Sequence, residues 1–351
     1  MGRTRVLVVE DSLTVRRYLV DVLGNASDLE LVGEAEDGKA AIELCERLRP
    51  DVITLDMMMP VMSGLTATEY IMAYCPTPIL IISSSTNRGE LFKTYDALAA
   101  GAVDVLEKPR ADELTAEWER KLLTTVRLVS RIRVITHLRA RLAEHLKRPP
   151  LPGVAEVTAA PSAFRCVAVG ASTGGPGAVL EILRGLEGFP LPMLLVIHIG
   201  EPFGFAMADW LDGLSPLRVS TVLHGQPMPQ PGDAKVIMAP HGQHMALRGG
   251  RLWLSDAPER HSCRPSVDVL FETVAQEMGA AAVACLLTGM GRDGAQGLLA
   301  MRRAGGLTVA QDEASSIVWG MPREAVQLGA AQEVLPLDRI AGRLMELTQG
   351  K

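Results

Sequence analysis

Short apolar runs alternate with helical patterns through the first third of the chain. Each run is followed by a stretch whose apolar residues recur every three or four positions. The predicted strands are Val6–Val9, Glu30–Glu34, Val52–Leu55, Ile79–Ile82 and Val103–Val105. The predicted helices lie near residues 13–23, 39–48 and 90–100, with one more after residue 64. Five βα units between residues 4 and 110 predict an α/β domain with a five-stranded, doubly wound, flavodoxin-like parallel sheet.

The C-terminal half contains longer unbroken apolar runs. Cys166–Val169, Met193–Ile197 and Ala282–Leu287 show no alternation of polar and apolar residues. Strands of parallel sheets are buried on both faces and have this pattern. The half from residue 165 to residue 351 is therefore predicted to be a second, Rossmann-like α/β domain with a mainly parallel sheet.

The segment that joins the two halves combines a helical pattern with a proline-rich stretch. Apolar residues recur every three or four positions through residues 111–148, which predicts a long amphipathic helix. This helix is basic, with nine Arg or Lys against two Glu between residues 119 and 148. It is interpreted either as a helix packed on the domains or as a surface that docks on a receptor. A flexible tether from Pro149 to Pro161 follows, so the predicted domains are 1–110 and 165–351, with a linker at 111–164.

Length and charge narrow the class of protein. With 351 residues, the chain is long enough for two domains, each with its own core. A net charge of −6 argues against nucleic-acid binding. No apolar run approaches the roughly 20 residues that span a bilayer, and no signal peptide is evident, so direct membrane insertion is not expected. The five cysteines are odd in number and form no C-x-x-C pair, which favours reduced thiols in a cytoplasmic protein.

Acidic residues follow two of the N-terminal strands. Glu10 and Asp11 follow the first strand, Asp56 follows the third, and Lys108 lies just past the fifth. The carboxyl ends of parallel strands meet at one edge of a sheet, so these side chains are expected to converge. Clustered carboxylates repel one another and suit a hard divalent cation, while a lysine opposite them can hold a phosphoryl group. The alternative is a solvated acidic rim with one surface lysine.

Three strand ends of the C-terminal half carry a possible catalytic triad. Ser172 lies in a glycine-rich turn between a strand and a helix, which favours the geometry of a nucleophile elbow. His198 ends the run from Met193, and Asp293 follows the run from Ala282. Serine needs a base to take its proton, and a carboxylate orients that base. The alternatives are a phosphate-binding or merely tight strand-to-helix turn at Ser172, a structural role for His198 and helix capping by Asp293.

Residues 4–110 resemble a two-component receiver domain. Asp56, within Leu-Asp-Met-Met-Met-Pro, matches the phosphoacceptor of that family. The resemblance implies that Glu10 and Asp11 hold Mg²⁺ together with Asp56 and the backbone carbonyl of Met58.

Two further receiver positions follow from the same resemblance. Ser83 matches the hydroxyl that moves toward the phosphoryl group, and Lys108 matches the lysine of the family. Val105 stands where the family carries an aromatic switch residue, so signalling by an aromatic flip is not expected.

Residues 165–350 resemble the catalytic domain of the chemotaxis protein-glutamate methylesterases. The resemblance rests on Gly-Ala-Ser-Thr-Gly-Gly-Pro at 170–176, His198, Cys-Arg-Pro-Ser-Val-Asp-Val-Leu-Phe at 263–271 and Leu-Thr-Gly-Met-Gly-Arg-Asp-Gly at 287–294. It implies the following roles for site residues: Ser172 as nucleophile, His198 as general base, Asp293 as orienting carboxylate, the Met290 amide as an oxyanion-hole donor and Thr173 as support for the triad. Ile199-Gly200 replaces the Met-Pro usual after the histidine, so the loop through residue 204 departs from the family pattern.

The resemblance also implies a reaction and partners. The reaction is hydrolysis of glutamate methyl esters, and deamidation of selected glutamines, on the cytoplasmic domains of methyl-accepting chemoreceptors, without a cofactor for ester hydrolysis. Control would come from phosphorylation by a histidine kinase of a chemotaxis-type system. The alternative is a receiver-controlled adaptor or binding module with a vestigial hydrolase domain in a non-chemotaxis signalling pathway.

Overall fold

The computed structural model describes residues 2–84, 87–109, 116–132, 134, 163–200 and 203–348. The chain divides into two compact units, residues 1–151 and 152–351. Among the described residues, no helix combines the length and apolar character needed to cross a membrane.

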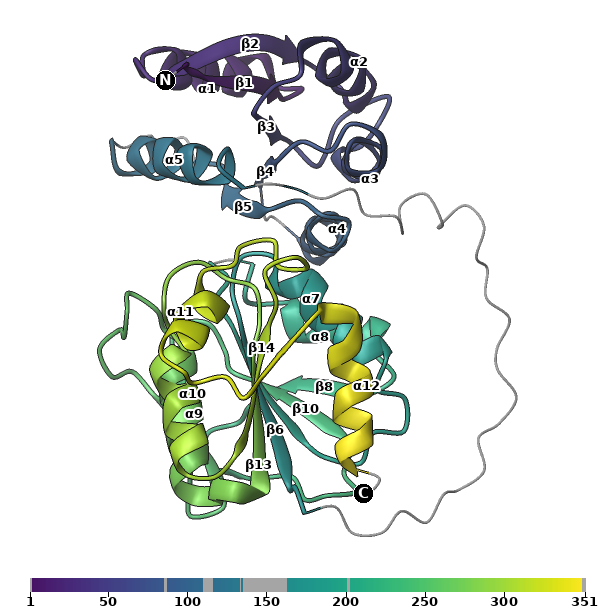
Figure 1. The fold of residues 1–351 in the computed structure, drawn as a ribbon. Coiled ribbons are helices and arrows are strands. Elements are labelled where there is room, and N and C mark those ends of the chain that lie inside the picture. Colours follow the sequence, from purple (N-terminus) through teal and green to yellow (C-terminus); the bar gives the residue numbers. More distant parts are fainter. Residues whose placement is uncertain are drawn as a thin grey trace. The chain divides into compact units, whose positions relative to one another are not determined.

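The N-terminal unit is a five-stranded parallel sheet with the order β2-β1-β3-β4-β5. Its strands are β1 (Thr4–Val9), β2 (Leu29–Ala35), β3 (Val52–Leu55), β4 (Ile79–Ser83) and β5 (Asp104–Glu107). Its helices are α1 (Leu13–Gly24), α2 (Gly38–Leu48), α3 (Gly64–Tyr74), α4 (Arg88–Ala99) and α5 (Ala116–Val129). Figure 1 shows α2, α3 and α4 on one side of the sheet and α1 and α5 on the other. The predicted doubly wound fold is confirmed, and β5 begins one residue later than predicted and extends to Glu107.

The helix predicted over residues 111–148 differs from the described structure. The described helix α5 ends at Val129, and Ser130 and Arg131 form a turn. Leu122, Val126 and Val129 are buried, and α5 packs against β3 and β4. This helix therefore completes the N-terminal unit, which extends past the predicted boundary at residue 110. Ile132 and Val134 are described and are not helical, while residues 133 and 135–148 of the predicted helix and the tether from Pro149 to Pro161 lie outside the described residues.

The C-terminal unit is built on a seven-stranded parallel sheet with the order β15-β14-β13-β6-β7-β10-β8. Its strands are β6 (Cys166–Ala171), β7 (Met193–Ile197), β8 (Arg218–Thr221), β10 (Lys235–Met238), β13 (Ala282–Leu286), β14 (Leu307–Gln311) and β15 (Glu333–Leu335). A small antiparallel sheet is formed by β9 (Gln226–Pro227), β11 (His244–Arg248) and β12 (Arg251–Ser255). The predicted mainly parallel sheet is confirmed.

Helices cover both faces of this sheet. They are α7 (Gly175–Arg184), α8 (Met207–Leu214), α9 (Val267–Met278), α10 (Ala295–Arg303), α11 (Met321–Gln327) and α12 (Leu337–Thr348), with a 3₁₀ turn, η1 (Gly279–Ala281), before β13. In Figure 1, α9, α10 and α11 lie on one face and α7, α8 and α12 on the other. Strand residues such as Ala168, Leu194 and Ala284 are fully buried between these layers, which fixes the strand ends where the site is built.

Candidate active site

The central strands of the C-terminal sheet bring three loops to one edge. β6 lies between β13 and β7, and Gly170 pairs with Leu286 while Ala171 pairs with Ile197. Ser172 and His198 therefore follow neighbouring strands at the same level, and the His198 N–H donates to the Ala171 carbonyl at 2.9 Å. The Ser172 N–H donates to the carbonyl of Thr288, which follows β13.

The turn after β6 owes its shape to Gly174 rather than to Ser172. Gly174 has φ +77°, and Ser172 is not among the residues with positive φ. Helix α7 begins at Gly175 with Pro176 in its first turn, and Gly175 N–H donates to the Ser172 carbonyl. The serine therefore lies in a tight strand-to-helix turn without the backbone strain of a typical nucleophile elbow.

His198 and Asp293 form the central pair of the site. His198 Nε2 lies 2.9 Å from Asp293 Oδ2, and their side chains are 13% and 2% exposed. Burial lowers the pKa of His198, but hydrogen bonds to Asp293 and Cys263 raise it, to about 9 overall. Because Nε2 is engaged by the carboxylate, Nδ1 is the ring nitrogen that remains for a substrate proton.

Asp293 is held by donors from the start of α9. Ser266 Oγ donates to Oδ1 at 2.7 Å, and the Val267 and Asp268 amides donate at 2.7 and 3.3 Å. Burial raises the pKa of Asp293, but the hydrogen bond and charge of His198, followed by the Ser266 and Val267 bonds, lower it below its usual value. Asp293 therefore stays ionised and accepts from α9, whereas the alternative interpretation assigned it to capping α10.

Two residues near the pair were not recognised from the sequence as parts of the site. His244, 1% exposed, accepts the Ser266 N–H at its Nδ1 and so orients the residue that holds Asp293. No role was assigned to His244 from the sequence, and strand β11 carries it into the interior. Cys263 Sγ lies 3.7 Å from His198 Nδ1, although only its place within a motif was noted.

The loop after β13 packs directly against Ser172. A Cβ atom at Gly289 would lie 2.7 Å from Ser172 Cβ. Within the described residues, the Met290 N–H and the Ser172 hydroxyl have no hydrogen-bond partner, so both are available to a substrate. The Thr173 side chain makes no described hydrogen bond to the triad residues; its carbonyl accepts from Thr288 Oγ1 at 2.9 Å. Of the loop that departs from the family pattern, Glu201 and Pro202 lie outside the described residues.

The N-terminal sheet edge brings together the predicted acidic residues. Carboxylate oxygens of Glu10, Asp11 and Asp56 lie within 4.8 Å of one another, and Lys108 Nζ lies 2.9 Å from both Asp56 and Glu10. Burial, followed by the charge of Asp56, raises the pKa of Glu10 to about 7, and burial also raises that of Asp56. Buried carboxylates of raised pKa are those that a bound cation would stabilise.

These residues fit a divalent cation. Lys108 hydrogen-bonds Glu10 through Oε1, while the buried Oε2 of Glu10 has no hydrogen-bond partner, although the Lys108 ammonium is near. An all-oxygen set with an exposed member, Asp11, suits Mg²⁺, which keeps several waters. Ser83 is 1% exposed, and its hydroxyl makes only a long, 3.4 Å contact with the Ser84 carbonyl.

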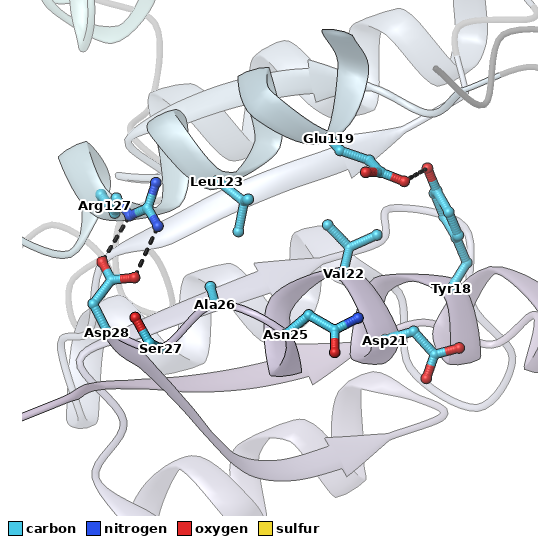
Figure 2. Close-up of a pocket in the computed structure, with 10 residues that line it drawn as sticks. All are labelled: Tyr18, Asp21, Val22, Asn25, Ala26, Ser27, Asp28, Glu119, Leu123 and Arg127. Carbon is cyan, nitrogen blue, oxygen red and sulfur yellow. Dashed lines mark hydrogen bonds and ion pairs between the residues drawn. The ribbon is translucent and has the colours of Figure 1, made fainter. Parts of the chain in front are cut away.

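A separate pocket of about 620 Å³ lies between α1 and α5 of the N-terminal unit. Figure 2 shows two side-chain contacts among its lining residues: Tyr18 donates to Glu119, and Arg127 binds Asp28 through two nitrogens at 2.7 and 2.8 Å. These bonds tie α5 to α1 and to the turn before β2. The pocket brings together no groups suited to catalysis.

Comparisons with known proteins agree with this arrangement. Residues 6–119 match the family described as response regulator receiver domain, and residues 167–344 match CheB methylesterase. A protein-glutamate methylesterase/protein-glutamine glutaminase of Anaeromyxobacter dehalogenans is 42% identical over 346 residues, which cover 98% of this chain and 97% of the relative. The corresponding protein of Nitrosospira multiformis is 44% identical over 355 residues, with 97% and 96% covered.

A solved structure is also similar. The CheB methylesterase catalytic domain of Thermotoga maritima is 32% identical and aligns with a TM-score of 0.49, covering 52% of this chain and 98% of that one.

The two family matches define a response regulator whose output domain is a hydrolase. The chain belongs to the CheB methylesterase family.

Proposed function

We propose that the chain hydrolyses glutamate γ-methyl esters on methyl-accepting chemoreceptors and deamidates selected glutamines there. The observation that supports the proposal is that Ser172, the His198–Asp293 pair and Met290, whose N–H has no partner among the described residues, follow neighbouring strands. The relatives with this name match nearly the whole chain, which supports the enzyme rather than an adaptor with a vestigial domain. A cytoplasmic location and control by a histidine kinase remain predictions.

The chemistry follows from the roles of these residues. Ser172 Oγ attacks the ester carbonyl carbon as its proton passes to His198 Nδ1, and Asp293 stabilises the imidazolium that forms. The Met290 N–H donates to the oxyanion of the tetrahedral intermediate. Collapse breaks the bond to the methoxy oxygen, which takes the proton from His198 and leaves as methanol. Water then attacks the acyl-enzyme by the same route and frees the glutamate and Ser172.

Control is proposed to act through Asp56. Its carboxylate accepts a phosphoryl group, and Lys108 binds the new oxygens. Glu10, Asp11, Asp56 and the Met58 carbonyl would hold Mg²⁺, which neutralises the phosphoryl oxygens when bound. Ser83 is placed to hydrogen-bond the phosphoryl group.

The test of the chemistry is Ser172→Ala. Without the attacking oxygen, methanol release from methylated receptor should fall by roughly 10⁴–10⁶-fold. A circular dichroism spectrum and phosphorylation at Asp56 like those of the wild type would serve as controls for folding. Methanol release at a near wild-type rate would refute the assignment.

A further inference from the structure

An open pocket beside the oxyanion loop is not used by the chemistry described above. It has a volume of about 770 Å³ and is named here the arginine pocket; its lining includes His261, Met290, Arg292, Trp319, Arg323 and Glu324. Its residues come from three segments: the loop before the cis Arg264–Pro265 bond, the loop after β13 and the start of α11.

The arginine pocket adjoins the nucleophile through the backbone. A Cβ atom at Gly320 would lie 2.6 Å from the Gly289 carbonyl and 3.2 Å from Met290 Cα, and Gly289 itself packs on Ser172. The Gly320 and Met321 amides both donate to the Gly289 carbonyl. One wall of the pocket is therefore fixed to the loop that contacts Ser172. Met290, whose N–H is assigned to the oxyanion, also lines the pocket, so the pocket borders the reacting groups.

The pocket carries more positive than negative charge. Arg292 has one described hydrogen bond, from Nε to His261 Nδ1 at 3.2 Å, and no carboxylate of the described residues pairs with it. Since His261 accepts at Nδ1, its proton is on Nε2. This Nε2 lies 3.1 Å from Oδ2 of the buried Asp268.

Arg323 has only a weak partner. Its nearest described carboxylate is Glu324 at 3.7 Å, and the two side chains are 52% and 33% exposed. An exposed ion pair of this length contributes little. The pocket thus presents two guanidinium groups against the single carboxylate of Glu324 in its lining.

We propose that the arginine pocket binds a carboxylate side chain of the substrate protein, three or four residues from the glutamyl ester on the same face of a helix. Guanidinium groups bind carboxylates through paired hydrogen bonds, and residues three or four apart on a helix lie about 5–6 Å apart. Exposed Met290 and partly buried Trp319 supply apolar contact for the stem of such a side chain. Arg292 and Arg323 are then specificity residues: they select acidic segments and take no part in bond breaking. This inference rests on the proposed function.

The experiment compares two substrates with full-length protein in one fixed phosphorylation state. Both are helical receptor fragments with labelled methyl esters; one has Glu three and four residues from the ester, and the other has Gln there. The wild type should prefer the Glu form in kcat/KM by about tenfold, mainly through KM, as expected for a charged hydrogen-bonded pair. Arg292→Gln and Arg323→Gln should bring this ratio toward one. A third substrate has Lys in place of the flanking Glu. Arg292→Glu should prefer this Lys form to the Glu form, the reverse of the wild type.

The matched control is Arg184→Gln. Arg184 is exposed at the end of α7 away from Ser172 and has no described partner. The ratio of kcat/KM for the Glu form to that for the Gln form should therefore be the same in Arg184→Gln as in the wild type. Equal wild-type rates on both substrates, or pocket variants that slow both substrates alike, would overturn the proposal. Ser172→Ala is measured in parallel on the Gln form, and persistent hydrolysis there would refute the proposed function instead.

Discussion

The His198 side chain has one polar neighbour on each ring nitrogen. Asp293 holds Nε2 at 2.9 Å, and Cys263 Sγ lies 3.7 Å from Nδ1, the atom assigned to the proton of Ser172. Cys263 therefore occupies the side of the base from which the serine must approach. Its sulfur also contributes to the raised pKa of His198, which works against an unprotonated base at neutral pH.

Replacement of Cys263 should change the pH dependence of the esterase. His198 must be unprotonated to act as a base, so wild-type kcat/KM should rise with pH toward about 9, the pKa of His198. Cys263→Ala removes a contribution that raises this pKa, so the rising limb should move to lower pH. Activity at pH 7 should then increase several-fold. The measurement is a pH profile of kcat/KM with a small ester.

Cys263→Ser provides the comparison for this profile, because a hydroxyl can still hydrogen-bond Nδ1 but does not ionise in this range. We expect the rising limb of the Cys263→Ser profile to lie between those of the wild type and Cys263→Ala. A profile of Cys263→Ala identical to that of the wild type would show that the sulfur does not influence the base.

At the scale of elements, the loop between β13 and α10 positions the reacting groups. Gly289 fits between Ser172 and Met321, and its carbonyl accepts the Gly320 and Met321 amides. Any side chain at position 289 would push the Met290 amide or Ser172 away from its place.

The prediction for this element is that Gly289→Ala lowers kcat by on the order of 10²-fold, the cost of misplacing catalytic groups by about 1 Å. Gly213→Ala is the control, because a Cβ at that position in α8 meets no atom within 4 Å. Both variants are assayed for methanol release and for thermal unfolding. If Gly289→Ala keeps full kcat, the loop does not need this close approach.

The elements also show what the sequence could and could not predict. The unbroken apolar runs before Ser172 and His198 correctly located two neighbouring strand ends. This was possible because a strand that is buried on both faces consists of consecutive apolar residues. The helical pattern past residue 111 predicted a continuous helix, yet α5 ends at Val129; periodicity identifies an apolar face but not where the chain turns.

The support around Asp293 depends on contacts between distant residues. Ser266 bonds Asp293 from 27 positions away, and His244 bonds Ser266 from 22 positions away. No local pattern predicts such bonds, because they depend on how β11 and α9 pack. Residues at strand ends were thus accessible to sequence reasoning, and the residues that hold them in place were not.

At the scale of the whole molecule, the acidic site of the N-terminal unit is expected to control the C-terminal one. Asp56→Asn keeps the size of the side chain but removes the carboxylate that accepts phosphate. Incorporation of label from acetyl phosphate should fall to background, and any stimulation of methanol release by the donor should be lost. Chelation of Mg²⁺ should have the same effect on the wild type. The control is Asp21→Asn, because Asp21 lies in α1 and has no described side-chain bond; incorporation of phosphate label should be unchanged in this variant. Phosphate label that persists in Asp56→Asn would mean that another residue is the acceptor.

Removal of the N-terminal unit should show whether this unit inhibits or activates the methylesterase activity of the C-terminal unit. Residues 152–351 form a compact unit with its own buried core, so a chain lacking residues 1–150 is expected to fold. A tethered unit has an effective concentration in the millimolar range, so even weak affinity for the catalytic unit would hinder a large substrate. We therefore expect the shortened chain to demethylate intact receptors faster than the unphosphorylated full-length protein, while both react with a small serine-directed phosphonate at similar rates. A shortened chain that is no faster on receptors would mean that the N-terminal unit acts by activation or docking, because no inhibition was relieved.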